Sequence, residues 1–473
     1  MSTALDTHSM TIGGAAVPAE GSFGVINPST GEVFDQAPEC TRPQLDAAMA
    51  AAAEAHGPWR SPDADGRRRE VLNACAGAVR AHIGELAPLL TREQGKPLAK
   101  AEAELKGAAK WFEYTATLEI PVEVALDNDR VRVEVRRRPH GVVAAITPWN
   151  YPVSLAVWKI APALRAGNTM VLKPSPFTPL ATLKLGEILR AVVPPGVLNV
   201  VSGSDDLGVW MTTHPAVRKI SFTGSVATGK LVAAAAASDL KRVTLELGGN
   251  DPAVVLPDVD PAAVAKKLFW GAFENCGQVC SAIKRVYVHA DQYAAFLEHL
   301  GAAATKARVG DGFDDASQIG PLNNAPQLER VTELVDDAKR NGARIVAGGQ
   351  RVGDRGYFFA PTIVGDVGDG TRLVDEEQFG PVLPIIPYTD LDDAVARANA
   401  THFGLSGSVW SSDVPHATEV ARGLECGTAW VNQHLNVLPH APFGGAKWSG
   451  IGVENGPWGL LGFTELQTVN VAK

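Results

Sequence analysis

The sequence predicts an α/β protein of more than one domain. At 473 residues the chain is too long for one ordinary core, and a domain size of roughly 150 residues suggests about three. From Gly141 onward, short apolar runs alternate with stretches of helical spacing, which is typical of buried parallel strands joined by crossover helices. The 47 Gly and 32 Pro residues supply the many turns that this alternation needs.

The expected elements follow one another along the chain. Residues 44 to about 110 have helical spacing, and residues 131–135 alternate as a strand with one side in water. A first α/β series has predicted strands at 142–146, 169–172, 197–201, 220–222 and 253–256. A second series runs from Arg285 to about Val431, with predicted strands at 286–288, 345–346 and 382–386. The tail, residues 461–471, is predicted to be another strand, too short to form a domain alone.

Composition and charge limit the classes of partner. With 45% hydrophobic and 20% charged residues and a net charge of −9, the chain resembles a folded soluble protein without the basic field that a nucleic-acid partner requires. No apolar run approaches the ~20 residues of a membrane span, so we expect no membrane partner. The first twenty residues contain Asp6, His8 and Glu20 and no apolar core, which argues against a cleaved secretion signal.

The five cysteines are too few and too scattered for a disulfide scaffold. Their odd number favours a reducing compartment, so we expect a cytoplasmic location. Cys276 and Cys280 have no second Cys or His pair at zinc spacing nearby, so no metal site is expected. Cys276 is either a small apolar neighbour of Cys280 or its partner under oxidation.

A glycine-containing turn separates the apolar run 220–222 from a helix predicted to begin near Thr228. Glycine lets the backbone approach a phosphate, and a helix N-terminus offers N–H groups and a positive dipole. Gly224 to Lys230 also spells G-x-x-x-x-G-K, but Leu231 stands where a P-loop needs Ser or Thr for magnesium. The segment is therefore either a nucleotide-binding loop or a plain turn.

Cys280 ends the segment FENCGQVC at 273–280, in which glycine and glutamine make a flexible polar loop. A cysteine is otherwise most often a small buried apolar residue. A reactive thiol needs positive potential, for which Lys159, Lys284 and Arg285 are available in the sequence.

Glu246 and Asn150 stand out in two further segments. Glu246 interrupts the apolar pattern VTLELGGN at 243–250, where burial would raise its pKa toward that of a useful base, unless it faces water at a strand end. Asn150, in TPWNYP at 147–152, could donate to an oxyanion or cap a helix. Lys173 at the end of a strand could reach a ribose or phosphate, or be a surface charge.

Together these segments resemble the NAD(P)-dependent aldehyde dehydrogenase superfamily, from NPSTG at 27–31 to PFGGAKWSG at 442–450. The resemblance rests on the order and spacing of Asn150, Gly224, Glu246, Cys280 and the segment EQFGP at 377–381. It implies an atypical Rossmann-type cofactor domain (1–120 and 140–248), an α/β catalytic domain (249–448) and a small β oligomerisation element (121–139 and 449–473). It also implies a homodimer or homotetramer.

The resemblance implies roles for individual residues. Cys280 corresponds to the nucleophile and Glu246 to the general base, while Asn150 and the Cys280 backbone N–H correspond to the oxyanion site. Lys159 and Glu454 correspond to a proton-relay pair found in some members. The residues implied at the cofactor are Ile146, Pro148, Trp149, Lys173, Ser175, Pro176, Gly203, Phe222, Gly224, Ser225, Thr228, Leu247, Glu377 and Phe379. Those implied at the substrate tunnel are Tyr151, Trp158, Trp270, Leu435, Val437 and Phe443.

The implied reaction is oxidation of an aldehyde to the carboxylic acid with NAD or NADP. Cys280 forms a thiohemiacetal and then a thioester, which water activated by Glu246 hydrolyses; that base argues against the CoA-acylating branch. The mostly apolar walls of the implied tunnel favour an uncharged aliphatic or aromatic aldehyde. Glu274, on the loop that carries Cys280, would further disfavour an anionic substrate. Pro176 stands where many NAD-preferring relatives carry a ribose-binding glutamate, which leaves NAD and NADP open.

Two other classes remain as alternatives. A P-loop ATPase or GTPase would use residues 224–230, against which Leu231 counts. An inert relative of the enzymes, with a binding or structural role, is disfavoured because Cys280, Glu246 and Asn150 are all present.

Overall fold

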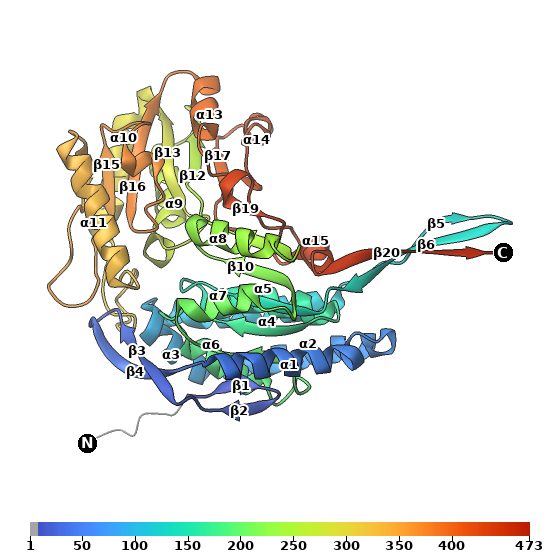
Figure 1. Cartoon of the computed structure of the whole chain (residues 1–473). Helices are drawn as coiled ribbons and strands as arrows, with labels where there is room; N and C mark the ends of the chain where they lie inside the picture. The colour runs from blue at the N-terminus through green and yellow to red at the C-terminus, as the bar shows by residue number, and fades with distance from the viewer. Residues whose placement is uncertain (1–7) are drawn as a thin grey trace.

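Two large sheets, each built mainly from parallel strands, organise the chain (Figure 1). The computed structural model describes residues 8–473, so Asp6 of the argument against a secretion signal lies outside the described residues. The first core draws its buried side chains from between Met10 and Leu247 and adds Leu460 and Phe463 from near the C-terminus. The second core lies between Ala253 and Leu424. The α/β fold class predicted from the sequence is confirmed.

The first sheet has eight strands in the order β19-β11-β10-β7-β8-β9-β1-β2. Its parallel strands are β7 (Val142–Ile146), β8 (Thr169–Lys173), β9 (Leu198–Val200), β10 (Val217–Thr223) and β11 (Arg242–Glu246). At its edges lie the antiparallel strands β1 (Met10–Ile12), β2 (Ala15–Val17) and β19 (Gly450–Ile451). The strands predicted at 142–146, 169–172, 197–201 and 220–222 all fall in this sheet.

The second sheet has seven strands in the order β14-β15-β16-β13-β12-β17-β18. Its parallel strands are β12 (Asp251–Val255), β13 (Ile283–His289), β15 (Thr362–Gly365), β16 (Val382–Tyr388), β17 (Ser406–Trp410) and β18 (Thr428–Val431). The predicted strand at 345–346 is β14 (Arg344–Ala347), which runs antiparallel to β15. The prediction of a parallel strand at 345–346 was therefore wrong. A parallel connection needs a crossover helix that carries the chain back to the end of the sheet where the previous strand began, and residues 348–361, all described, contain no helix.

Helices cover both sheets. Before the first parallel strand lie α1 (Arg42–Trp59), α2 (Asp65–Ala81), α3 (Ile83–Gln94) and α4 (Leu98–Thr117). The crossovers of the first sheet are α5 (Pro152–Arg165), α6 (Leu180–Leu189), α7 (Asp205–Thr213) and α8 (Val226–Ala237). The remaining helices are α9 (Pro261–Phe273), α10 (Tyr293–Lys306), α11 (Ala325–Arg340), α12 (Arg372–Asp375), α13 (Leu391–Asn399), α14 (Val414–Arg422) and α15 (Gly456–Leu461).

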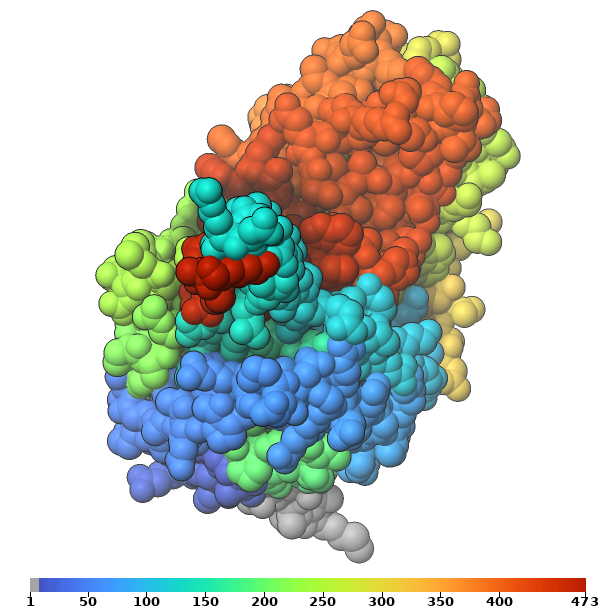
Figure 2. Space-filling model, turned by 90° about the vertical axis from the view of Figure 1, so that its right-hand side faces the viewer, coloured from blue at the N-terminus to red at the C-terminus, as the bar shows by residue number. Residues whose placement is uncertain are grey.

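Two antiparallel elements lie outside the large sheets. A hairpin of β3 (Gly21–Asn27) and β4 (Glu32–Glu39) precedes α1. A three-stranded arm of β5 (Glu123–Asp127), β6 (Val131–Pro139) and β20 (Thr464–Ala472) projects from the body, with β6 in the middle (Figure 1). Figure 2 shows the arm end-on, where the tail β20 lies against the segment of β5 and β6. No helix between residues 8 and 473 is long and apolar enough to cross a membrane.

Candidate active site

Two cavities meet at Cys280. One, of about 690 Å³, and the other, of about 620 Å³, both have Cys280 and Asn150 in their walls. The first is lined mainly by aromatic and aliphatic side chains. The second runs past the N-terminus of α8 to Glu377 and Phe379. One thiol and one amide are therefore shared between two separate chambers.

The loop that carries Cys280 has an unusual backbone. The 3-10 turn η2 (Glu274–Gly277) contains consecutive left-handed residues, with φ of 50° at Asn275, 58° at Cys276 and 71° at Gly277. A Cβ on Gly277 would lie 2.2 Å from the Gly380 carbonyl oxygen, so glycine is needed there. The Gln278 side chain anchors the loop by accepting a hydrogen bond from the Asn323 backbone N–H at 2.8 Å.

The Cys280 thiol lies in a negative environment. Burial, with Glu246, Asp251 and Glu377, raises the pKa of Cys280 well above its usual value. The Lys284 and Arg285 side chains, which the sequence offers as sources of positive potential, donate to the backbone oxygens of other residues. Lys284 Nζ donates to the carbonyls of Gly277 and Gly380, and Arg285 Nε donates to the Asn250 carbonyl at 2.8 Å.

Glu246 is the last residue of β11 and is 1% exposed. The interpretation of a strand-end glutamate facing water is therefore wrong. Burial, helped by the charge of Glu454 and opposed by that of Lys159, raises the pKa of Glu246 to about 8. Neither carboxylate oxygen has a hydrogen-bond partner of acceptable geometry among residues 8–473. An unpaired carboxyl with a pKa near neutrality has the character of a general base.

Lys159 reaches the sheet beside Glu246. It lies on α5, is fully buried, and its Nζ donates to Thr223 Oγ1 at 2.7 Å and to the Glu454 carboxylate. Thr223 is paired with Glu246 in the register of β10 and β11. Lys159 and Glu454 therefore lie next to the candidate base.

Asn150 precedes α5 and is 3% exposed. Tyr151 occupies the N-cap position, so the interpretation of Asn150 as the helix cap is wrong. Its Nδ2 donates to the Gln278 carbonyl at 3.0 Å, which uses one of the two N–H bonds of the amide. The other N–H can serve an oxygen bound at Cys280.

The second cavity contains six of the fourteen residues implied at the cofactor, namely Pro148, Trp149, Gly224, Ser225, Glu377 and Phe379. Ser225 caps α8 by accepting from the Thr228 N–H, so this helix begins at Val226 rather than near Thr228. A Cβ on Gly224 would lie 2.5 Å from the Phe222 ring, which keeps this turn bare. The helix N-terminus and the bare turn together suit a pyrophosphate.

Glu377 and Phe379 lie together in the wall of this second cavity. Glu377 Oε1 accepts from the Gly249 N–H at 3.1 Å, and burial raises the pKa of Glu377 to about 7. The Phe379 ring packs edge-to-face on Trp149 with centroids 5.3 Å apart. An apolar wall beside a buried carboxyl fits a nicotinamide riboside, so the residues present fit NAD or NADP.

The other eight implied cofactor residues do not line this cavity: Ile146, Lys173, Ser175, Pro176, Gly203, Phe222, Thr228 and Leu247, all in the described chain. Phe222 and Leu247 instead pack against Gly224 and Gly229. Lys173 is 3% exposed, and burial lowers its pKa to about 8, against the opposing charges of Asp205 and Glu39. The alternative interpretation of Lys173 as a surface charge is therefore wrong.

The P-loop alternative gains no support. The Lys230 ammonium lies 3.5 Å from the centre of the Trp448 ring, and Leu231 is 72% exposed. The lysine of a P-loop would instead reach back to the phosphates.

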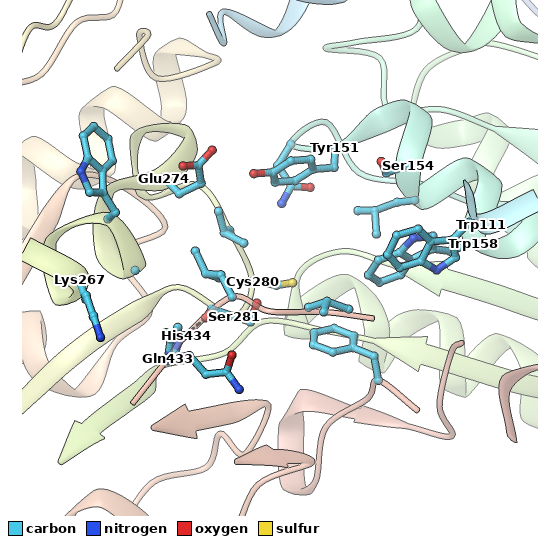
Figure 3. A pocket seen from close by; sticks show the side chains of 18 of the residues that line it. Trp111, Tyr151, Ser154, Trp158, Lys267, Glu274, Cys280, Ser281, Gln433 and His434 are labelled. Atoms are coloured by element: carbon cyan, nitrogen blue, oxygen red, sulfur yellow. Dashed lines mark hydrogen bonds between the residues drawn. The ribbon is translucent and has the colours of Figure 1, made fainter. Parts of the chain in front are cut away.

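All six implied substrate residues line the first cavity: Tyr151, Trp158, Trp270, Leu435, Val437 and Phe443. Figure 3 shows Cys280 between the pair Trp111 and Trp158 on one side and Lys267 and Glu274 on the other. Trp111, which was not predicted from the sequence, stacks on Trp158 with ring centroids 5.5 Å apart. Three further residues of this wall were not predicted either: Lys267, Gln433 and His434. Nothing local in the sequence marks these residues, because long-range packing brings them to the wall.

All five cysteines are free thiols, and burial raises the pKa of Cys276 to about 12. Within the described residues, no group of three or more His, Cys, Asp or Glu side chains is arranged to hold a metal ion.

Comparison with known proteins identifies the family. The sequence profile of the aldehyde dehydrogenase family matches residues 17–469. Retinaldehyde dehydrogenase 3 of Homo sapiens is 40% identical over 458 residues, 95% of this chain and 89% of that protein. An aldehyde dehydrogenase of Enchytraeus buchholzi is 40% identical over 459 residues, 95% of this chain and 92% of that protein. The structure of an NAD+ complex of aldehyde dehydrogenase from Bacillus cereus has a TM-score of 0.96 and 35% identity, and the match covers 99% of this chain and 97% of that one.

The chain belongs to the aldehyde dehydrogenase family. It is an oxidoreductase that oxidises an aldehyde to the carboxylic acid with NAD or NADP, as the resemblance implied.

Proposed function

We propose that Cys280 is the nucleophile, Glu246 the general base, and the Asn150 amide with the Cys280 backbone N–H the oxyanion site. The observation that carries this proposal is the position of Cys280 and Asn150 in the walls of both cavities. An aldehyde carbon placed where the two cavities meet can contact the Cys280 thiol and the Asn150 amide. It also faces the second cavity, which fits the cofactor.

The residues then have the following tasks. The Cys280 sulfur adds to the aldehyde carbon, and the new alkoxide accepts hydrogen bonds from Asn150 and the Cys280 backbone. The thiol proton leaves as the C–S bond forms, and Glu246 is the neighbouring carboxylate that takes it. NAD or NADP, when bound, supplies the acceptor for the two electrons that turn the thiohemiacetal into a thioester.

Glu246 acts again in the hydrolysis. It removes a proton from the water that attacks the thioester carbon, after which the C–S bond breaks and the carboxylic acid leaves. Before this step Glu246 passes on the proton that it took from the thiol: the Glu454 carboxylate accepts it, and the Lys159 ammonium paired with Glu454 balances the charge. Water as the acyl acceptor makes this a non-CoA-acylating enzyme.

The substrate is an uncharged aliphatic or aromatic aldehyde. Trp158 packs between Trp111 and Phe443, with ring centroids 5.5 and 5.7 Å away. This aromatic wall favours an apolar chain. Glu274 repels an anionic substrate less than its charge alone predicts, because Lys100 Nζ donates to its carboxylate at 2.9 Å and compensates that charge.

We further propose that the chain assembles through its arm into a homodimer or homotetramer in the cytoplasm. The arm presents two open strand edges, β5 and β20, with exposed apolar side chains such as Leu126 and Leu466. Open apolar edges of this kind favour pairing between subunits.

The test uses the purified full chain, an aldehyde panel, and NAD and NADP at equal concentration. Cys280→Ala should lower turnover by more than about 10³-fold, while Cys426→Ala, a second half-buried thiol, should leave it unchanged. Glu246→Gln should give one rapid burst of reduced cofactor and then a slow steady state, because thioester hydrolysis is impaired.

Full dehydrogenase activity of Cys280→Ala would refute the assignment. Release of acyl-CoA in preference to the free acid would overturn the hydrolytic branch. The ratio of initial rates with the two cofactors decides between NAD and NADP.

A further inference from the structure

We infer that Lys96 and Glu104 are a positioning pair that holds the Asn150 amide at Cys280. Neither residue lines the two cavities of the active site within the described chain, although both border a smaller polar cavity of about 380 Å³ behind Tyr151. The inference rests on the oxyanion role proposed above for Asn150.

Lys96 approaches Asn150 from behind. It follows Gly95, whose φ of 98° turns the chain at the end of α3, and it is 2% exposed. Its Nζ donates to the Asn150 carbonyl at 2.9 Å and forms an ion pair with Glu104. The same ammonium lies 3.8 Å from the centre of the Tyr151 ring. One charge thus contacts both residues that lead into α5.

Glu104 supplies the cap that α5 lacks. The N-cap residue Tyr151 has no side-chain hydrogen bond to the first turn. Instead, one carboxylate oxygen of Glu104 accepts from the backbone N–H groups of Val153 and Ser154, each at 3.1 Å. A carboxylate at this place also complements the positive end of the helix dipole. The start of α5 is therefore tied to α4.

The contacts fix Asn150 on both sides. Its carbonyl accepts from Lys96 and from Asn275 Nδ2 at 3.1 Å, and its amide donates to the Gln278 carbonyl at 3.0 Å. Attraction within a buried ion pair is largely offset by desolvation, so its main effect here is on geometry. A displacement of a catalytic group by about 1 Å can cost on the order of 10²-fold in rate.

The experiment is a double-mutant cycle on the full chain. Because one change alone leaves a buried unpaired charge, Lys96→Met and Glu104→Gln are made together, in wild type and in Asn150→Ala. The pair variant should lower kcat by about 10- to 100-fold in wild type, with a smaller effect on KM, but less than about 3-fold in Asn150→Ala. The matched control replaces an exposed ion pair on α4, the helix that carries Glu104. This control variant, Lys106→Met with Glu102→Gln, should leave kcat unchanged.

Three further measurements separate positioning from folding. Circular dichroism and thermal unfolding report whether the pair variant is folded, and the rate of Cys280 alkylation by iodoacetamide should stay within about 3-fold of wild type. If the pair variant does not fold, Lys96→Arg takes its place in the cycle, because it keeps the charge but alters the contact with Asn150.

Equal losses of kcat in wild type and in Asn150→Ala would overturn the inference, as would a loss no larger than that of the control pair. A normal kcat for Asn150→Ala itself would instead overturn the oxyanion role, so the two failures are distinguishable.

Discussion

At the scale of single residues, the surroundings of Cys280 and Glu246 define how the site depends on pH. Glu246 is buried and Cys280 half-buried, and the pKa of Glu246 is raised to about 8. A base must be ionised to accept a proton, so the active fraction of Glu246 grows as the pH rises toward 8 and levels off above it.

We therefore expect kcat to rise about tenfold per pH unit below pH 8 when thioester hydrolysis limits turnover, and to flatten above pH 8. The measurement is the steady-state rate between pH 5.5 and 9.5 at saturating aldehyde and cofactor. Glu246→Gln should lose this rising limb. A wild-type rate that falls across the same range would contradict the assignment of the base.

The residues proposed to carry the chemistry lie in local motifs, so their place at one site could be predicted from the sequence. Cys280, Glu246 and Asn150 each sit in a segment whose pattern is visible in the sequence, and all three reach one site. Their partners could not be predicted, because they come from distant segments. Lys284 and Arg285 are close to Cys280 in sequence but donate to backbone carbonyls instead, whereas Trp111 and Lys96 were missed.

At the scale of elements, the start of α8 couples the fold to the proposed cofactor site. Ser225 both caps this helix and lines the second cavity. The apolar strands were easy to predict because each is a short continuous run, while β14 was assigned the wrong direction. Strand direction depends on the connection between two strands, and the residues of a strand do not encode it.

Ser225→Ala should destabilise the protein by about 1 kcal/mol, because the Thr228 N–H loses its acceptor. It should also raise the KM for the cofactor while leaving Cys280 alkylation unchanged. Denaturant unfolding and initial rates at varied cofactor concentration measure the two effects. As a control, Ser225→Thr keeps a hydroxyl at the cap and should have most of the wild-type stability. Equal stability of Ser225→Ala and wild type would show that the cap contributes nothing.

At the scale of the whole molecule, the arm is the part that the body does not cover. Leu466 on β20 is 62% exposed, and Val124 and Leu126 on β5 are 48% and 46% exposed. The sequence indicated strands at 131–135 and 461–471, but their pairing with each other and with β5 follows only from the three-dimensional structure.

Leu466→Glu should shift the assembly toward the single chain, because a charge would be buried in the proposed interface. Light scattering coupled to size-exclusion chromatography measures the mass. Val209→Glu, on α7 and 59% exposed, is the matched control and should keep the wild-type mass. A wild-type protein that elutes as a single chain would contradict the proposed assembly.

The common wall of the two chambers also has a consequence for inhibition. Consider a compound whose electrophilic centre reacts with the Cys280 sulfur. An apolar tail on it would lie in the first cavity among Trp111, Trp158 and Phe443. An anionic extension on the other side would pass Asn150 into the second cavity and approach the turn at Gly224. One bifunctional compound would then exclude both natural ligands at once. Its potency should fall when either ligand is supplied in excess, whereas a compound confined to one chamber would be displaced by one ligand only.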